Sequence, residues 1–317
     1  YYGSKKTKQT MKKYIIILFF ATLLPAFTMA CDICGCGVGN SYIGILPDFK
    51  KRIFGLRYRN NSIFSHMGVD DSFTYLTTKE TYNTVEAWGS WNLGKKFRLM
   101  ASVPYSFNER TNNAITENKN GLDDITLTGY YQLLNNRQAI ASNKLLVQSL
   151  WLGGGIKLAT GNYNPTDKNF TNENANLFQL GTGSYDFNFN GMYDIRLQDM
   201  GINLSSNYKI TTANKYDYKY GNKFNINTQL YYKFSVKNKL SLAPNAGVQF
   251  ETATKDMDDG FIVTTSGGNI LLGTIGIETA FGKFAVGANF QTPFSQNLAN
   301  GTVKANDRLM LHAAIAF

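Results

Sequence analysis

The sequence predicts an all-β fold, namely a transmembrane antiparallel up-and-down β-barrel of about twelve strands that follows a cleaved signal peptide. Three observations lead to this prediction. Apolar and polar residues alternate with period two in many segments, and the connections between these segments alternate between long and short. The last segment is amphipathic and ends on Phe317, which is typical of the signal read by the barrel-assembly machinery. A soluble β-sandwich, the alternative, would share only the alternation.

The alternation is clearest at residues 240–251 and 223–234, where every second residue is apolar and the intervening residues are mostly small and polar. Such a polar face suits a narrow, wet lumen, and aromatic residues near strand ends suit the two membrane interfaces. The predicted strands are 51–63, 80–93, 97–108, 122–134, 144–159, 177–196, 200–211, 221–235, 240–253, 270–281, 284–294 and 307–317. The long connections are 64–79, 109–121, 160–176, 212–220, 254–269 and 295–306.

The N-terminal thirty residues predict export. Residues 1–10 precede Met11 and are set aside as upstream sequence. Two lysines after Met11, the apolar run 14–27 and small residues at Thr28 and Ala30 make residues 11–30 a signal peptide with cleavage after Ala30. The run is shorter than the roughly 20 residues of a spanning helix, so a retained anchor is the weaker alternative. We therefore expect a periplasmic segment at 31–50 and an outer-membrane barrel at 51–317.

The net charge does not argue for nucleic acid as a partner. The formal charge is +10. Five lysines and no acidic residue precede the predicted cleavage point, which leaves +5 for the mature chain. That excess is too small to indicate a nucleic-acid surface.

Charged residues fall on the inward face of the predicted strands. Nine basic and six acidic residues, joined by His312, would line a mixed and slightly cationic lumen that selects its permeants. The alternative is that these charges pair across strands and fill a small barrel. The predicted lumen-lining residues are Arg57, Arg59, Glu86, Arg98, Asp124, Lys157, Asp186, Asp194, Arg196, Lys209, Lys223, Lys233, Glu251, Glu278, Arg308 and His312.

All three cysteines lie together at the predicted mature N-terminus. Cys31, Cys34 and Cys36 form a C-x-x-C-x-C pattern that could hold copper as Cu(I) or zinc as Zn(II). Lipidation of Cys31 is a second interpretation, although Thr28 stands where a Leu-like residue is expected. A disulfide that leaves one thiol over is the third.

Enzymatic chemistry is not expected. The chain has two histidines, and His312 would face the lumen without a serine marked as its partner. The acidic loop at Asp256, Asp258 and Asp259 could bind Ca²⁺, but its spacing does not continue into a full calcium loop, so a solvated loop is the preferred interpretation.

Glycine-containing motifs in the middle of the chain resemble a known family. They are Gly121-Leu-Asp-Asp-Ile125, Lys157-Leu-Ala-Thr-Gly161-Asn-Tyr163 and Leu180-Gly-Thr-Gly-Ser184-Tyr-Asp186, within residues 121–251. In this order and spacing the chain resembles the outer-membrane transporter family named after the meta-pathway of phenol degradation. Ala159 stands where the family usually has proline. The resemblance implies a transporter-like barrel and fixes no substrate.

Two functions follow as expectations. The first is an outer-membrane channel for passive or selective uptake of a small solute, with outer-membrane lipid, lipopolysaccharide and the assembly machinery as its other partners. The second is a closed barrel that anchors the N-terminal cysteines, which would bind a metal such as copper. A conducting pore would separate the first from the second.

Overall fold

The computed structural model describes residues 52–112, 115–140, 144–167, 176–236 and 240–317. The predicted upstream residues, the signal peptide and the cysteine-bearing segment lie outside these ranges. Within them, no helix is long and apolar enough to cross a membrane.

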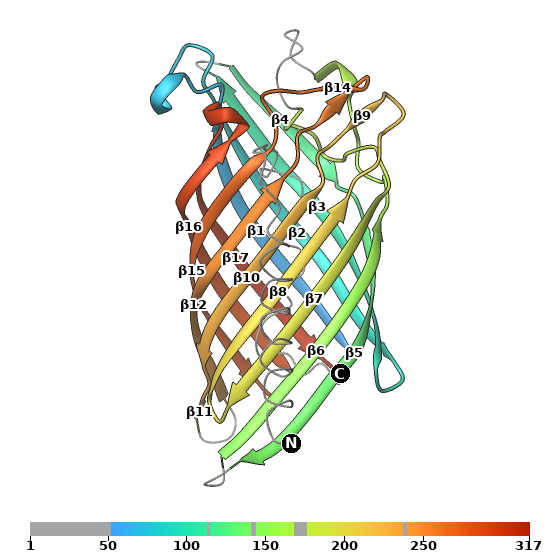
Figure 1. Cartoon of the computed structure of the whole chain (residues 1–317), viewed down its shortest axis with the longest axis vertical. Helices are drawn as coiled ribbons and strands as arrows, with labels where there is room; N and C mark the ends of the chain where they lie inside the picture. The colour runs from blue at the N-terminus through green and yellow to red at the C-terminus, as the bar shows by residue number, and fades with distance from the viewer. Residues whose placement is uncertain (1–51, 113–114, 141–143, 168–175, 237–239) are drawn as a thin grey trace, which may run out of the picture.

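Twelve long strands of the described residues form one closed antiparallel barrel, which confirms the predicted fold class (Figure 1). Each strand pairs with its neighbours in the chain, and β1 pairs with β17 to close the wall. The wall strands are β1 (Ile53–Ser65), β2 (Thr78–Leu93), β3 (Phe97–Asn112), β5 (Thr126–Ile140), β6 (Lys144–Lys157), β7 (Asp186–Leu197), β8 (Met200–Ile210), β10 (Lys223–Tyr232), β12 (Leu240–Ala253), β15 (Gly268–Phe281), β16 (Phe284–Leu298) and β17 (Lys304–Ala316).

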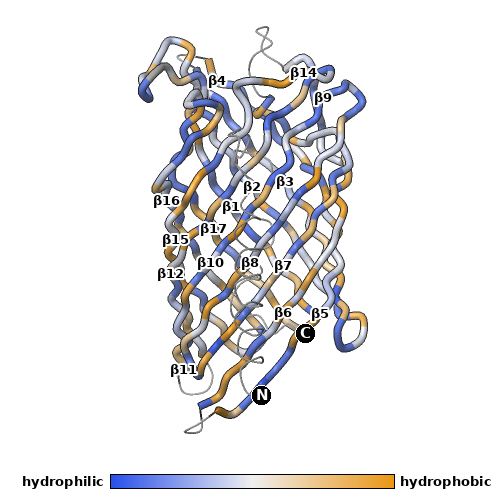
Figure 2. Tube along the Cα trace, in the orientation of Figure 1, coloured by the Kyte–Doolittle hydropathy of each residue, from blue (hydrophilic) through white to orange (hydrophobic). Residues whose placement is uncertain are grey.

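Period-two alternation gives the wall an apolar outer face and a polar inner face. On β1, Leu56 is 51% exposed, whereas the next residue, Arg57, is 1% exposed. The same alternation of apolar and polar residues runs along the strands in Figure 2. Because successive side chains of a strand point to opposite faces, a wall of this kind fits an apolar exterior around a polar interior.

The two ends of the barrel differ. At the short-turn end, tight connections join the strands, and Phe317 hydrogen-bonds to the backbone of Arg52. At the long-loop end lie the 3₁₀ turns η1 (Val69–Asp71), η3 (Pro165–Asp167) and η4 (Ala299–Gly301). This end also carries a small sheet of β9 (Tyr218–Lys219), β13 (Met257–Asp258) and β14 (Phe261–Ile262), whereas β11 (Phe234–Val236) pairs with β12 at the opposite end (Figure 1).

Aromatic side chains fill part of the interior toward the short-turn end. Trp88, Tyr130 and Trp151 belong to one buried cluster. Their rings lie against glycines, since a Cβ atom at Gly55 would stand 2.5 Å from the Trp88 ring and one at Gly153 would stand 2.6 Å from Tyr130. These glycines therefore make room for rings inside the wall.

Several predicted boundaries are wrong, among them those of the predicted strand 122–134, which runs from Thr126 to Ile140. The predicted strand 177–196 begins only at Asp186, because residues 176–185 leave the wall. The predicted loop 109–121 contains the end of β3 and an extra strand, β4 (Ile115–Leu122), which pairs with β3. The predicted loop 295–306 is shortened by the ends of β16 and β17.

Candidate functional site

Residues 176–185, here called the crossing segment, turn from the β6–β7 connection into the barrel. The side chains of Asn176, Phe178 and Thr182 in this segment are all less than 10% exposed. The segment is held at one side by polar contacts to the wall and at the other by apolar packing.

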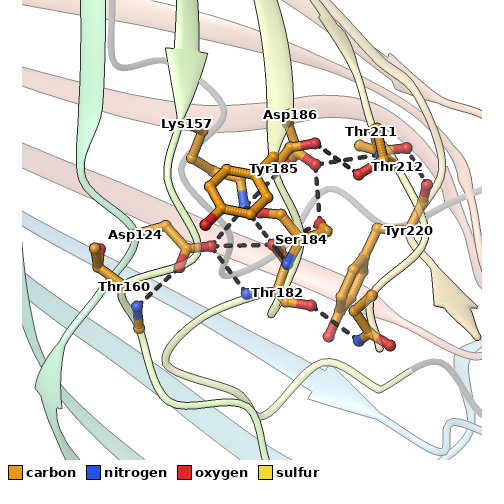
Figure 3. Close-up of polar contacts among 12 residues, drawn as sticks. Asp124, Lys157, Thr160, Thr182, Ser184, Tyr185, Asp186, Thr211, Thr212 and Tyr220 are labelled. Atoms are coloured by element: carbon orange, nitrogen blue, oxygen red, sulfur yellow. Dashed lines mark hydrogen bonds and ion pairs between the residues drawn. The ribbon is translucent and has the colours of Figure 1, made fainter. Parts of the chain in front are cut away.

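The polar contacts centre on Lys157, the last residue of β6. Its Nζ atom lies 2.5 Å from Asp124 Oδ2 and 3.1 Å from Asp186 Oδ2. It also donates to Thr182 Oγ1 and, at 3.1 Å, to the backbone oxygen of Ser184. Figure 3 shows the ammonium group between the two carboxylates. Each of these side chains is at most 8% exposed, so the cation and the two carboxylates offset one another's burial.

The Asp124 carboxylate also fixes backbone near both ends of the β6–β7 connection. It accepts hydrogen bonds from the backbone N–H groups of Gly161 and Thr182, both at 2.9 Å. Thr160 Oγ1 donates to the backbone oxygen of Asp123 at 3.0 Å and accepts from the Ile125 N–H at 2.8 Å. The three segments that carry the family motifs in the sequence therefore meet at this place.

Glycine is required at Gly161 and Gly181, where the two ends of the β6–β7 connection lie against each other. A Cβ atom at Gly161 would lie 2.7 Å from Gly181 Cα, and one at Gly181 would lie 2.6 Å from the Gly161 carbonyl carbon. No side chain fits between the backbones at this distance. The glycines of the motifs thus have a packing reason.

Apolar packing holds the other side of the crossing segment. Leu177 and Phe178 belong to one contiguous buried cluster with side chains of β1, β2, β12, β15 and β16 and the start of β17. In the order of strands around the wall, β16 and β17 lie opposite β6 and β7. The cluster therefore reaches across the barrel near its long-loop end.

Phe178 also contacts two cations. Its ring lies 4.6 Å from the Arg110 guanidinium carbon and 5.0 Å from Lys119 Nζ. Lys119, on β4, donates a 2.5 Å hydrogen bond to the backbone oxygen of Phe178. The extra strand β4, which extends the β3 hairpin, thus serves to hold the crossing segment.

A polar chamber lies inside the wall, on the side formed by β8 to β17 and β1. It has about 710 Å³ of space unfilled by atoms, counting the part open to solvent. Amide and hydroxyl side chains dominate its lining, which consists of Arg59, Asn61, Ser205, Ser206, Asn207, Asn225, Asn227, Gln229, Gln249, Asn289, Gln291, Arg308, Leu309 and Met310.

The predicted lumen residues fall into two groups by exposure. Eleven have side chains below 9% exposed: Arg57, Glu86, Arg98, Asp124, Lys157, Asp186, Lys209, Lys223, Glu251, Glu278 and His312. Five are partly exposed, namely Arg59, Asp194, Arg196, Lys233 and Arg308. Arg196 and Lys233 lie beside the short turns, where Arg196 donates to the backbone oxygen of Gln198.

Many of these charges are paired with each other. Glu86 lies 3.0 Å from Arg57 and 3.5 Å from Arg59. Arg308 binds Glu251 through two hydrogen bonds of 2.9 and 3.2 Å. Further contacts join His312 to Glu278 at 3.9 Å, Arg98 to Asn92 at 2.9 Å and Asp194 to the Tyr231 hydroxyl at 3.1 Å. The alternation of the sequence did not reveal these partners, because pairing depends on the register between strands.

The acidic loop is organised differently from the prediction. Asp256 is fully buried, and its carboxylate accepts hydrogen bonds from the Tyr218 hydroxyl at 2.5 Å and the Gly221 N–H at 2.7 Å. The expectation of a solvated loop is therefore wrong for Asp256, which instead joins two loops of the long-loop end.

Within the described ranges, no group of three or more His, Cys, Asp or Glu side chains is placed to hold a metal ion. Cys31, Cys34 and Cys36 lie outside those ranges. The cysteine hypothesis thus remains a prediction from the sequence.

Two solved structures are similar to the barrel. An outer membrane channel from Pseudomonas putida F1 superimposes with a TM-score of 0.59 at 15% identity, covering 89% of this chain and 100% of that chain. The beta domain of the Bordetella autotransporter BrkA gives 0.50 at 10% identity, covering 84% and 100%. At such identities the likeness shows the fold alone. A comparison with curated proteins gave no match.

A family model matches residues 61–305, which is well over half of the chain. The matched range contains all three motifs that meet around Asp124 and Lys157. The chain belongs to the family described as "Putative MetA-pathway of phenol degradation".

Proposed function

We propose that the protein is an outer-membrane channel through which a small polar solute moves passively. The observation that carries this proposal is a closed barrel whose outer face is apolar and whose interior holds a polar chamber. An interior of uncharged amides supplies hydrogen bonds to a solute that has left bulk water. Diffusion through such a chamber needs no covalent step.

The orientation follows from the loops. In bacterial outer-membrane barrels the short turns face the periplasm and the long loops face outward. On this basis we infer that Arg52 and Phe317 face the periplasm, and we propose the same side for the cysteine-bearing segment 31–50. Lipid and lipopolysaccharide would surround the wall, and the amphipathic strand β17 would present the assembly signal.

In this orientation the crossing segment lies at the outer entrance of the channel. Phe178 and its apolar neighbours narrow that entrance, and the Lys157 contacts hold them in place. We infer that a solute passes beside the segment or waits for it to move, so the entrance limits both size and rate.

A second function is favoured by the same segment. Because apolar packing reaches from the β6–β7 connection to the opposite wall, the barrel could be closed and serve as an anchor. Its activity would then lie at Cys31, Cys34 and Cys36, with copper or zinc as the ligand.

Single-channel recording separates the two functions. The chain from Cys31 to Phe317 would be refolded and inserted into a planar bilayer. Discrete and reproducible current steps are expected for a channel. A barrel that is folded by its heat-modifiable migration on a gel, yet remains silent, would overturn the channel proposal and favour the closed barrel.

A further inference from the structure

We propose that the chamber is a binding site for a neutral, hydroxyl-rich solute such as a sugar or polyol. This inference rests on the proposed channel function and adds the chemical class of its solute. It stands on three properties of the chamber, which are its unpaired amides, its charged side chains that already lie beside carboxylates, and its access from solvent.

The first property is a set of buried amide atoms that lack a hydrogen-bond partner among the described residues. Asn289 is 2% exposed, and neither its Nδ2 nor its Oδ1 atom is paired. Gln229, also 2% exposed, leaves Oε1 unpaired, and Asn227 leaves Oδ1 unpaired. Buried amides are normally paired, because an unpaired one loses its bonds to water without replacement. The chamber therefore offers one donor and three acceptors to a ligand.

Hydroxyl groups match this set of atoms. A hydroxyl both donates and accepts, so a solute with several of them can donate to the three acceptors and accept from Asn289 Nδ2. A carboxylate can only accept and would leave the acceptors unpaired. An apolar ring would leave both kinds of atom unpaired.

The second property is that each charged side chain of the lining already lies beside a carboxylate of the protein. The charged residues of the lining are Arg59 and Arg308. Both oxygen atoms of the Glu251 carboxylate accept a hydrogen bond from the Arg308 guanidinium. Arg59 lies 3.5 Å from Glu86, a carboxylate that it shares with Arg57. An anionic solute would have to compete with these carboxylates and a cationic one would approach the arginines, whereas a neutral solute needs no counter-charge.

The third property is access. The unfilled space of about 710 Å³ includes a part that is open to solvent, so a solute inside the barrel reaches the lining directly. A pair of neighbouring amides already hydrogen-bonds across the lining, since Gln291 Nε2 donates to Gln249 Oε1 at 2.8 Å. That bond holds two residues of the lining in place beside the unpaired amides.

The test compares three solutes of equal size. Proteoliposomes of the full chain would be loaded with radiolabelled D-glucose, D-gluconate or D-glucosamine, and the efflux of each would be followed. Glucose should leave at least about fivefold faster than either charged analogue, because only the charged analogues need a counter-charge when they leave water. Equal rates for all three, or gluconate as the fastest, would overturn the proposal.

Binding by the detergent-solubilised protein separates this inference from the channel proposal. Equilibrium titration with D-glucose reads the site even where nothing crosses the membrane. Saturable binding without efflux would contradict the channel and keep the site. Efflux of all three solutes without saturable glucose binding would contradict the site and keep the channel.

Variants locate the site. Asn289→Leu and Gln229→Leu should each weaken glucose binding about fivefold. Gln138→Leu makes the same chemical change on an exposed residue of β5 and should leave binding unchanged. Asn289→Asp keeps the shape of the side chain and adds a negative charge, so it should favour glucosamine over glucose. Wild-type affinity in the folded Asn289→Leu and Gln229→Leu proteins, with unaltered selectivity in Asn289→Asp, would sink the proposal.

Discussion

The cluster around Lys157 and the amide-lined chamber lie in the same barrel interior, but they differ in whether their buried polar groups are paired. Around Lys157 the cation has two carboxylates within 3.1 Å, and Asp124 in addition accepts three hydrogen bonds from Gly161 and Thr182. In the chamber, Asn289 is equally buried, and both polar atoms of its side chain lack a partner among the described residues.

The difference separates a structural role from a ligand-binding role. A fully paired ionic cluster fixes one arrangement of its neighbours, because moving any member leaves a charge unpaired. Neutral amides without partners fix nothing, but they can exchange bonds with a passing solute at little cost. The charges around Lys157 therefore build the entrance, and the amides of the chamber meet the solute.

The largest expected effect comes from removing the cation of the ionic cluster. Lys157→Met leaves Asp124 and Asp186 buried without their counter-charge, at a cost of about 3–5 kcal/mol. We expect a lower unfolding temperature and release of the crossing segment, seen as a severalfold increase in single-channel conductance. Lys215→Met, which changes an exposed lysine of a loop, is the matched control. Unchanged conductance and stability in Lys157→Met would refute the structural role of the cluster.

A smaller effect is expected on the apolar side of the same segment. Phe178→Ala removes a ring packed against Tyr82, Arg110 and Lys119, with a loss of about 3 kcal/mol. The entrance should widen, which larger neutral solutes would report by faster efflux. Phe73→Ala, at a ring that is 69% exposed, should change neither property. If Phe178→Ala conducts like the wild type, the entrance is not limited by this ring.

The wall of the barrel could be predicted from the sequence because its signal is local. Alternation such as that of residues 240–251 reports which side of a strand each residue occupies, and β12 forms at 240–253. Strand β4 was missed for the same reason. Its sequence, ITENKNGL, has mostly exposed side chains on both faces, so no alternation marks it.

The crossing segment shows what a local pattern cannot report. Residues 177–185 are partly apolar and directly precede the alternating residues of β7, so in the sequence they resemble the start of that strand, but the structure has several bends there. They leave the wall because Thr182 and Ser184 bind Lys157, and Leu177 and Phe178 join a distant cluster. Likewise, the alternation of the predicted strands 221–235 and 284–294 puts Gln229 and Asn289 on the inward face. Which amides stay unpaired there depends on the register between several strands, which the alternation does not report.

A change in the selectivity between cations and anions is expected at Arg308, a charged residue of the chamber lining. The loss of stability should be smaller than in the two variants above. Arg308 is partly exposed to the chamber and pairs with the buried Glu251. Arg308→Met leaves the Glu251 carboxylate without its counter-charge. Such a carboxylate attracts a permeating cation about 4 Å away by about 4 kcal/mol before salt screens the interaction. We expect the ratio of cation to anion permeability to rise roughly threefold or more once salt screens the charge. Reversal potentials in a salt gradient measure it.

The double variant Glu251→Gln with Arg308→Met restores neutrality and is the control. It should return the permeability ratio to the wild-type value. A ratio that stays high in the double variant would show that Arg308 acts otherwise than by balancing Glu251.

The smallest effect on the barrel is expected at the cysteines. Cys34→Ser with Cys36→Ser removes two of the three thiols that could hold a soft metal ion, so retained copper or zinc should fall to background. Heat-modifiable folding and conductance should be unchanged, because the chamber and the cluster around Lys157 are built from residues after Arg52. Metal content measured on purified protein tests the first expectation. Equal metal content in the variant and the wild type would remove the metal hypothesis, and a change in conductance would show that residues 31–50 act on the channel itself.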